Sequence, residues 1–384
     1  MKHEIIDGRI IFHPKGAITS TTAPEVERDI EKTLQGQKIE AIDLDLEDVN
    51  YVSSAGLRVI LKYKKLYPDT RAINVTPEVY DVLEMTGFTT MMDVRRQLLE
   101  VSVEGAKLIG EGFFSLVYRL DHDTIIKVFR NEVRIEEVER ELKLAKQAFV
   151  LGIPTAISYD VVHVGDRLGV RFEMLDCASL RDCFRDHPED HETLVRKYAE
   201  LLTTINTTTT LDPNLPDARV LWLTKADACA PFLSKEEAKK LKGLIESVED
   251  RDTFVHGDCH FKNIMVQNGE LLLIDMDTLS KGHPIFELAA IYATYIAFEE
   301  ATPGNNLNFL GIDSPQVTTI FHDVLAHYFG KFDETIYAKI ALVSYTHMIW
   351  WNQVNDPTNQ NRHDVCLQNL RKRLAQVSDL DIGK

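Results

Sequence analysis

The chain has 384 residues, which at roughly 100–200 residues per domain is enough for two or three domains. Apolar residues make up 44% and charged residues 27%, values typical of globular proteins that exclude a disordered or collagen-like chain. The formal net charge of −17 repels phosphate backbones and anionic lipids, so neither nucleic acid nor a membrane surface is an expected partner. The 5 cysteines include no C-x-x-C pair, which argues against a disulfide framework or a thiolate zinc site and favours the reducing cytoplasm.

The first hundred residues alternate strand and helix patterns. Strands are predicted at three places: 5–18 (two strands with a turn at Asp7-Gly8), 39–52 and 72–75. Helices are predicted after Thr22 and Thr76, whose hydroxyls would cap them, and from residue 57 onward. This order predicts an α/β domain over residues 1–100, a small sheet with helices packed on it, and a domain boundary between 98 and 104.

Two serines stand where the third predicted strand meets a helix. Ser53 and Ser54 follow a buried strand, and the helix begins at once. The N-terminus of a helix offers unpaired N–H groups and the positive end of its dipole. A hydroxyl there can cap the helix, and a phosphoryl group there would be favourably placed.

This segment resembles the D-S-S-G-L motif of STAS domains in anti-sigma factor antagonists. Aligned on Gly56, the serine that a partner kinase phosphorylates in that family falls on Ser54, while Ser53 replaces the family aspartate and Ala55 the second serine. The resemblance covers nearly the whole first domain. It implies a STAS-like fold, a protein partner and Ser54 as a candidate phosphosite, whereas the alternative is that both serines only cap the helix.

A second pattern begins at Ala106 and predicts a separate domain over 105–384. In chain order it indicates strands at 107–120 and 124–129, a helix around 138–149, strands at 156–164 and 168–174, helices over 179–249, three short strands within 254–277, and then helices. The apolar tract at 284–298 contains Glu287 and is too short and too polar to span a bilayer, so a buried helix is expected.

A glycine-rich turn lies between the first two strands of this domain. Gly110 and Gly112 let backbone N–H groups approach phosphates, and Ser115 stands where a kinase loop has its third glycine. Lys127 follows inside an apolar strand, where an unpaired ammonium would be costly. A lysine that binds phosphates needs a carboxylate to hold it, and Glu141 on the next helix is the candidate.

The strongest motif runs from His256 to Asn263. Asp258 precedes Asn263 by five residues, the spacing of a catalytic loop in which the aspartate accepts a hydroxyl proton and the asparagine binds magnesium. Asp275 ends a strand shortly downstream, and oxygen ligands from Asp and Asn suit magnesium. Each piece alone is a common turn or cap, but the pieces in this order indicate phosphoryl transfer.

Residues 105–384 resemble the aminoglycoside phosphotransferase, or choline kinase-like, branch of the protein-kinase-like fold. The match is to H-G-D-x-x-x-x-N at His256–Asn263 and to the downstream I-D at Ile274-Asp275. A third match is to G-x-P-x-x-D-L-A at Gly282–Ala289, with Glu287 at the family aspartate.

This resemblance implies an α+β bilobal domain with ATP as donor and Mg²⁺ as metal. The small lobe is expected at about 105–174 and the helical lobe at about 177–384, with Glu173 and Leu175 in the hinge that binds adenine. Because Met276 stands where protein kinases have the phenylalanine of D-F-G, and no glycine follows, no conventional activation loop is expected.

We therefore expect a cytoplasmic kinase that transfers the γ-phosphate of ATP to an alcohol group, with the STAS-like domain in regulation or partner binding. Lys127 would hold phosphates, Glu141 would orient Lys127, Asp258 would be the base, and Asn263 and Asp275 would hold the metal. The acceptor could be a protein serine or threonine, or a small aminoglycoside-, choline- or sugar-like molecule. The alternative from another class is a non-catalytic signalling protein that binds nucleotide and acts through its STAS-like domain.

Several other side chains have two interpretations. His260 could position phosphate or substrate, but a loop histidine is more often structural. Trp222, Trp350 and Trp351 could line the acceptor cleft, but core packing is the more frequent role of tryptophan. The acceptor pocket itself is expected from the helical segment near 200–250 and from the C-terminal helices.

Overall fold

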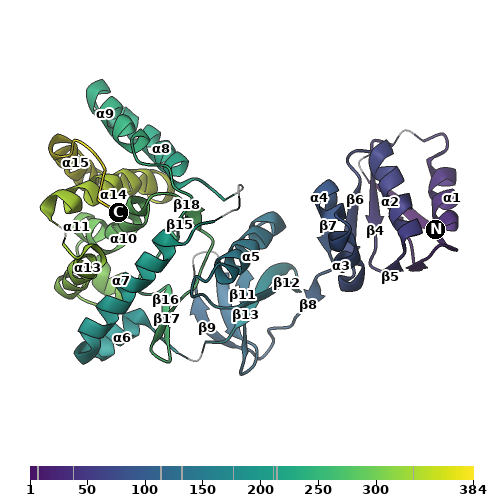
Figure 1. Cartoon of the computed structure of the whole chain (residues 1–384), viewed down its shortest axis with the longest axis horizontal. Coiled ribbons are helices and arrows are strands. Elements are labelled where there is room, and N and C mark those ends of the chain that lie inside the picture. The colour runs from purple at the N-terminus through teal and green to yellow at the C-terminus, as the bar shows by residue number, and fades with distance from the viewer. Residues whose placement is uncertain are drawn as a thin grey trace. The chain divides into compact units, whose positions relative to one another are not determined.

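The computed structural model of the chain describes residues 1–6, 8–37, 39–112, 115–130, 133–175, 177–210, 212, 215–331 and 333–384. These residues form two compact units, Met1–Val101 and Ser102–Lys384 (Figure 1). The predicted turn at Asp7 and the hinge residue Asp176 lie outside the described residues, as does the tip of the glycine-rich loop at 113–114.

The first unit is built on a mixed sheet with the strand order β1-β2-β4-β6-β7. β1 pairs antiparallel with β2, and the other neighbours are parallel. A separate parallel pair is formed by β3 and β5. The bounds are β1 (Lys2–Ile6), β2 (Arg9–His13), β3 (Gly16–Ile18), β4 (Ala41–Asp45), β5 (Val49–Val52), β6 (Arg71–Val75) and β7 (Asp93–Arg96); the two-residue β8 (Leu99–Glu100) follows.

The central strand β4 explains the period-two pattern of apolar residues in this part of the sequence. Ile42 and Leu44 are buried in the apolar core of this unit. Asp43, which points to the opposite face, is also buried and receives ion pairs from Arg9 at 2.7 Å and Arg71 at 2.5 Å. A charge can be buried in a sheet only when such partners compensate it.

Four helices accompany this sheet: α1 (Ala23–Leu34), α2 (Ser54–Leu66), α3 (Pro77–Met85) and α4 (Phe88–Met91). The close fit of α2 depends on Gly56, because a Cβ there would lie 2.8 Å from a methyl of Ile18 and 2.9 Å from one of Val52. Packing therefore explains the glycine that follows the two serines.

Two of the predicted helix caps are wrong. The hydroxyl of Thr22 donates to the carbonyl of Ala17, and that of Thr76 donates to the carbonyl of Val49 at 2.7 Å. Neither side chain makes a cap hydrogen bond to its own helix. Both threonines instead connect the start of a helix to a neighbouring strand or turn by a hydrogen bond. The local sequence does not predict these bonds, because their acceptors lie outside the helix.

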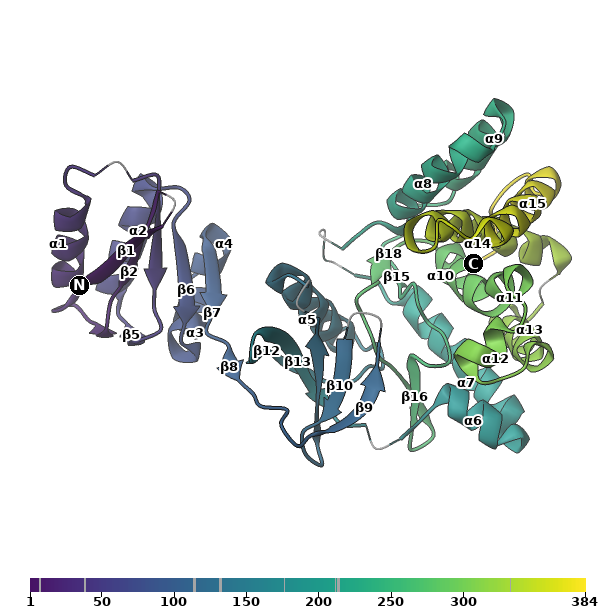
Figure 2. The same ribbon diagram turned by 180° about the vertical axis from the view of Figure 1, so that it is seen from behind.

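The second unit begins with an antiparallel sheet in the order β12-β13-β11-β10-β9. Its strands are β9 (Lys107–Glu111), β10 (Ser115–Arg119), β11 (Thr124–Phe129), β12 (Ser158–Val164) and β13 (Arg167–Glu173). The helix α5 (Ile135–Val150) lies against this sheet, with Val138, Leu144 and Ala148 on its buried face (Figure 2). This is the small lobe of the unit.

The remainder is a helical lobe whose described residues form two short sheets, β14-β16-β17 and β15-β18. Its helices are α6 (Leu180–Asp186), α7 (His191–Thr207), α8 (Ala218–Cys229), α9 (Lys235–Glu246), α10 (Pro284–Tyr292), α11 (Phe298–Ala301), α12 (Asn305–Leu310), α13 (Ser314–Phe329), α14 (Glu334–Asn355) and α15 (Gln360–Gln376). The short strands are β14 (Ala178–Ser179), β15 (Phe254–Val255), β16 (Ile264–Gln267), β17 (Glu270–Leu273) and β18 (Ser280–Lys281). The loop between β15 and β16 contains the predicted catalytic motif.

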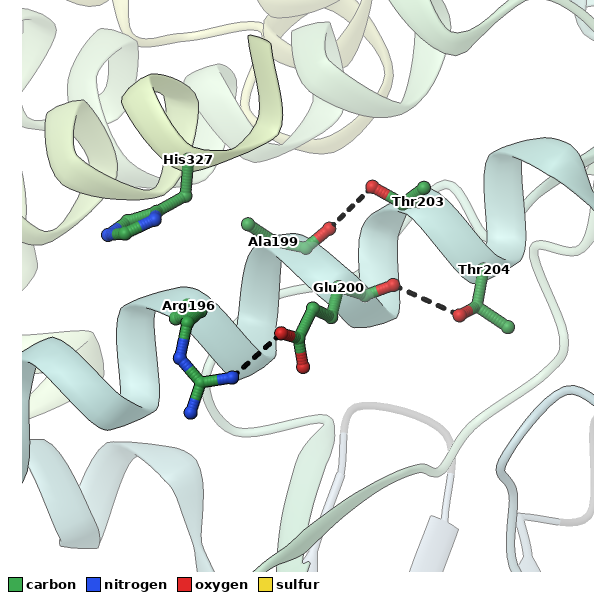
Figure 3. Close-up of a pocket in the computed structure, with 6 residues that line it drawn as sticks. All are labelled: Arg196, Ala199, Glu200, Thr203, Thr204 and His327. Atoms are coloured by element: carbon green, nitrogen blue, oxygen red, sulfur yellow. Dashed lines mark hydrogen bonds and ion pairs between the residues drawn. The ribbon is translucent and has the colours of Figure 1, made fainter. Parts of the chain in front are cut away.

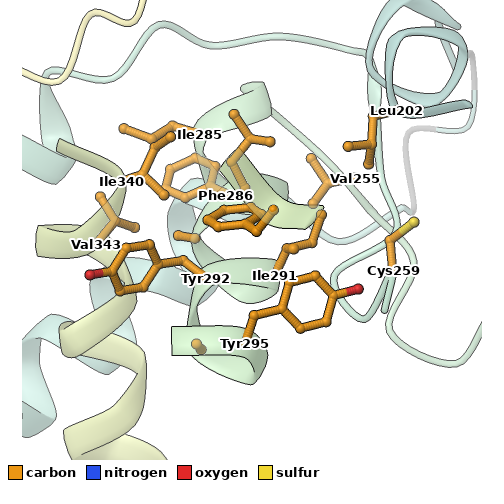
Figure 4. Close-up of a cluster of buried hydrophobic side chains, with 14 of the residues drawn as sticks. Leu202, Val255, Cys259, Ile285, Phe286, Ile291, Tyr292, Tyr295, Ile340 and Val343 are labelled. Atoms are coloured by element: carbon orange, nitrogen blue, oxygen red, sulfur yellow. The ribbon is translucent and has the colours of Figure 1, made fainter. Parts of the chain in front are cut away.

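The apolar tract after residue 284 forms the centre of the helical lobe, as predicted. Almost all of α10 is buried, and the chain continues through a π-helical turn, Ala293–Ala297, into α11. Figure 4 shows Phe286 within this cluster, Tyr292 beside Val343, and Tyr295 on the side of Cys259, which lies in the motif loop. Among the described residues, no helix has the length and apolarity needed to cross a membrane.

Candidate active site

Lys127 on β11 pairs with one carboxylate of the small lobe and one of the helical lobe. Its ammonium lies 2.7 Å from Glu141 on α5 and 2.9 Å from Asp275, which follows β17. Burial opposes the positive charge, but Asp275 and Glu141 outweigh burial, so the pKa of Lys127 lies above its usual value. The lysine is therefore charged at neutral pH, and the structure places it with two of the residues that the sequence predicted as its neighbours in the site.

Asp258 and Asn263 lie five residues apart in the loop that follows β15. The Asn263 amide nitrogen donates to the Asp258 carboxylate at 2.9 Å and to its backbone carbonyl at 3.0 Å. Burial raises the pKa of Asp258, with further contributions from Asp275 and Asp277, while 42% of its side chain stays exposed and water moderates the shift. The carboxylate is thus both fixed in place and open to an incoming molecule.

The backbone of this loop is held by side chains that sequence analysis did not identify as site residues. Glu287 on α10 is fully buried and accepts the N–H groups of His256 at 2.5 Å and Gly257 at 3.2 Å. Tyr198 on α7 donates to the Cys259 carbonyl. These partners lie tens of residues away, and the only local signal was the position of Glu287 in a family motif.

Two buried histidines complete the loop. The ring of His256 accepts the N–H of Asp258 at 3.2 Å, and burial lowers its pKa to about 4, so the ring is neutral and braces the loop. His260 lies with its Nε2 atom 3.5 Å from Asp258, and burial lowers its pKa to about 4 as well. A neutral His260 can share a hydrogen bond with Asp258 but adds no positive charge beside it.

Asp275 adopts an unusual backbone conformation, with φ of 67°. Non-glycine residues seldom occupy this left-handed region, and such strain concentrates at functional sites. Asp277, two residues on, has its pKa raised by burial and by the Asp275 carboxylate. An acidic pair therefore faces Lys127 at the end of β17.

The glycine-rich loop closes through its own backbone. The N–H of Gly112 donates to the carbonyl of Ser115 at 2.8 Å, and Gly110 pairs with Val117 in the sheet. Ser115 is the buried first residue of β10 and is paired with Phe129. Its carbonyl closes the turn, and a contact of its backbone with phosphates stays a prediction.

The predicted hinge residues lie at the end of β13. Glu173 is the last residue of that strand; its N–H donates to the carbonyl of Ile157 at 2.9 Å, and its carboxylate accepts the N–H of the same residue at 2.7 Å. The side chain of Leu175 is buried, with 8% exposed. Both residues connect the small sheet to β14 and the helical lobe.

The tryptophans and a surface groove lie elsewhere in the helical lobe. Trp222 is 5% exposed and stacks on Phe286 at 5.6 Å, which fits core packing. A groove of about 390 Å³ lies along α7 and α13, lined by Arg196, Ala199, Glu200, Thr203, Thr204 and His327 (Figure 3). None of the predicted site residues lines this groove. Its threonine hydroxyls donate to carbonyls of α7, and Arg196 pairs with Glu200, so these polar groups already have partners.

In the first unit, Ser53 and Ser54 have different surroundings. The Ser53 hydroxyl accepts the N–H of Gly56 at 3.4 Å and is the cap of α2. Ser54 is the first residue of the helix and is exposed. The candidate phosphosite is therefore accessible, while its neighbour is the cap.

Comparison with known proteins identifies the families of the two units. The profile of the phosphotransferase enzyme family, APH, matches residues 105–311, more than half of the chain, and the STAS domain profile matches residues 1–101. The chain belongs to the phosphotransferase enzyme family. Its first unit is a STAS domain, so the fold is a STAS domain followed by a protein-kinase-like domain, as the two resemblances implied.

Individual proteins are similar to each half of the chain. The STAS domain is 30% identical over 94 residues to BtrV of Bordetella bronchiseptica, described as a candidate anti-sigma factor antagonist; the match covers 23% of this chain and 79% of that protein. An ADP-bound aminoglycoside phosphotransferase APH(2'')-Ib is similar in structure at 16% identity and a TM-score of 0.49, covering 70% of this chain and 94% of that one. A choline/ethanolamine kinase family protein from Mesorhizobium loti is similar at 12% identity and a TM-score of 0.48, covering 70% and 91% of the respective chains.

Proposed function

We propose that this phosphotransferase moves the γ-phosphate of ATP to a hydroxyl group in a Mg²⁺-dependent reaction. The observation that carries the proposal is the joint placement of two sets of residues. Lys127 is held between Glu141 and Asp275, and Asp258 is fixed by Asn263 on the neighbouring loop. Positioning and charge stabilisation of this kind are the main catalytic requirements of phosphoryl transfer.

Each side chain has a distinct role in the proposed reaction. Lys127 binds phosphate oxygens, and Glu141 orients Lys127. The acceptor oxygen forms a bond to the γ-phosphorus while the bond to the bridging oxygen of ADP breaks, and the acceptor proton passes to Asp258. The exposed side of the Asp258 carboxylate is where that hydroxyl can approach.

The residues also fit a magnesium ion. Since Asn263 uses its amide nitrogen toward Asp258, its carbonyl oxygen is the atom turned to other partners, and Asp275 supplies a carboxylate. Oxygen donors of this kind are those that Mg²⁺ prefers. A bound ion would neutralise charge on the phosphates. The nucleotide's base is proposed to bind at the backbone of Glu173 and Leu175, and Gly110 and Gly112 to cover its phosphates.

The STAS domain is proposed to regulate the enzyme or to bind a protein partner. Its relative BtrV is named for antagonism of an anti-sigma factor, which is an activity of protein–protein contact. The exposed Ser54 at the start of α2 is the proposed modification site of this domain.

Incubation with labelled ATP and Mg²⁺, followed by measurement of ADP release and intact mass, tests the proposal. We expect turnover by the wild type with a suitable alcohol and none by Asp258→Asn. A chain that binds Mg²⁺–ATP but gives no turnover with proteins, amino alcohols or sugars would favour the non-catalytic signalling alternative.

A further inference from the structure

One lysine of the catalytic loop makes no ion pair or side-chain hydrogen bond with the residues that the structure describes. Lys262 lies between Asp258 and Asn263 in the sequence, and its ammonium sits 4.3 Å from the centre of the Phe309 ring on α12. A ring face attracts the positive charge but does not replace a carboxylate as an acceptor for the three N–H donors of the ammonium.

The lysines of this lobe are held in two ways. Lys281 lies 2.7 Å from Asp252, and Lys339 contacts Asp379. Lys225, like Lys262, instead lies over aromatic rings, 4.2 Å from the centre of Trp222 and 5.1 Å from that of Trp350. Burying part of an ammonium without an anionic partner costs free energy, and of these two lysines Lys262 is the one on the catalytic loop. An anion bound at Lys262 would lower that cost.

Lys262 is also close to the reacting group. The Phe309 ring that it contacts lies 5.3 Å from the ring of His260, and His260 lies 3.5 Å from the Asp258 carboxylate. Phe309 itself is 39% exposed. The ammonium, a half-exposed apolar ring and the proposed base therefore form one continuous set of contacts on the catalytic loop.

The charges around Lys262 define what could bind there. Its strongest charged neighbours are Arg181 on α6, which repels it, and Asp258, which attracts it. Arg181 is paired with its neighbour Asp182. Lys262 therefore presents a positive charge on this side of the loop, next to the carboxylate of the proposed base.

From this placement we propose that the acceptor carries an anionic group, a carboxylate or a phosphate, a short distance from the hydroxyl that is phosphorylated. Lys262 binds that anion, and Phe309 packs against the carbon between the two groups. The inference rests on the proposed function and narrows its acceptor to hydroxy acids, phosphorylated alcohols or acidic hydroxyl-bearing peptides. Polycationic acceptors are disfavoured because Lys262 and Arg181 would repel them.

Matched pairs of alcohols test the proposal with the full chain saturated with Mg²⁺–ATP. Glycerol is compared with glycerate and with glycerol 3-phosphate, and a serine peptide flanked by aspartates is compared with one flanked by lysines. Choline serves as a cationic alcohol. Transfer kinetics and calorimetric binding with Mg²⁺–ADP are measured for the wild type, Lys262→Met, Lys262→Arg and the exposed control Lys239→Met.

We expect the anionic member of at least one pair to be preferred about tenfold or more by the wild type, Lys262→Arg and Lys239→Met. Lys262→Met should lose the preference through a higher KM or Kd while retaining kcat with neutral alcohols. Whether the small acids or the acidic peptide show the effect distinguishes the two sources of the anion. The inference is overturned if no pair shows the preference, if Lys262→Met retains it, or if Lys262→Met lowers kcat equally with all alcohols.

Nucleotide binding separates this inference from the proposed function. If the wild type shows no Mg²⁺-dependent thermal stabilisation by ATP, the proposed function fails, whatever the alcohols do. If nucleotide stabilises all four proteins equally but no anionic preference exists, only the assignment of Lys262 fails. Equal stabilisation of Lys262→Met also shows that this variant is folded.

Discussion

Lys127 is the single charge on which nucleotide binding depends most in the proposed mechanism. Methionine at this position keeps the length of the side chain and removes its ammonium, leaving Glu141 and Asp275 facing each other unpaired. We expect Lys127→Met to bind Mg²⁺–ATP about tenfold more weakly or worse, a loss of about 1.4 kcal/mol. Thermal-shift titration measures this loss, with Lys146→Met on the exposed side of α5 as the control. Equal affinities of the two variants would contradict the role of Lys127.

Substitutions at Asp258 and at Asp275 should affect different steps, phosphoryl transfer and metal binding respectively. Asp258→Asn keeps the shape of the side chain and removes the proton acceptor, so we expect transfer to fall about 100-fold or more with nearly unchanged nucleotide binding. Asp275→Asn removes an anionic oxygen donor, so its main effect should be a higher Mg²⁺ requirement. Magnesium titrations of nucleotide affinity and of transfer distinguish the two. If both variants lose nucleotide binding to the same extent, the assigned roles are wrong.

At the residue scale, contacts between site residues could be predicted from the sequence where the residues lie close together in the chain. Asp258 and Asn263 are five residues apart, and one loop brings them into contact. Lys127 and Asp275 are 148 residues apart, and their proximity was predictable only through a family resemblance. Phe309 lies in no motif, so its contact with Lys262 depends on how α12 packs and could not be read from the chain.

At the element scale, the first turn of α10 holds the backbone of the catalytic loop through the carboxylate of Glu287. Burial raises the pKa of Glu287 to about 7, even though backbone N–H groups from the loop oppose the shift. Glu287 therefore contributes stability below its unfolded pKa of about 4.3, and this contribution is lost as pH rises through 7. Relative to Glu287→Gln, we expect the wild type to lose about 2 kcal/mol of unfolding free energy between pH 5 and pH 8.

Tryptophan fluorescence during urea unfolding measures this difference, because all 3 tryptophans lie in the second unit. Glu270→Gln is the control, since that carboxylate is exposed and lies on β17. A difference between wild type and Glu287→Gln that stays constant from pH 5 to pH 8 would mean that Glu287 does not titrate in this range. The catalytic loop would then be held by a permanently charged carboxylate.

The order of strands and helices was largely readable from periodicity, but several elements were not. β7 at Asp93–Arg96 completes the STAS sheet although its sequence is highly charged, because as an edge strand it keeps two residues exposed and two half-buried. β3 and β5 lie inside the ranges 5–18 and 39–52 that were predicted as strands, but the sequence did not separate β5 from β4. Among the described residues, β3 and β5 pair with each other and not with the larger sheet. Their apolar patterns are too short to mark them as separate strands.

At the scale of the whole molecule, two units of different families share one chain. The sequence pattern put their boundary between residues 98 and 104, and the structure divides the chain after Val101. Covalent fusion raises the effective concentration of each unit for the other, and chains that associate can act on one another. The serines at the start of α2 are therefore candidate acceptors for the phosphotransferase unit of the same chain or of an associated chain.

The two serines at this site should differ as phosphate acceptors. The Ser53 hydroxyl is used as the cap of α2, and its loss on modification would cost about 1 kcal/mol of helix stability. Ser54 is exposed, and a phosphate there gains from the positive end of the helix dipole. We therefore expect any phosphate added at this turn to be found on Ser54.

Phosphopeptide mapping after incubation with Mg²⁺–ATP tests this expectation in the wild type, Ser53→Ala, Ser54→Ala and Asp258→Asn. Phosphate on Ser54 that persists in Ser53→Ala and is absent from Asp258→Asn would assign both the site and its source to this chain. A kinase that turns over ATP but leaves Ser54 bare, even with added STAS domain, would mean that another kinase must supply it. Phosphate on Ser53 would contradict the argument from the helix cap, because the capping hydroxyl would then be the more reactive of the two.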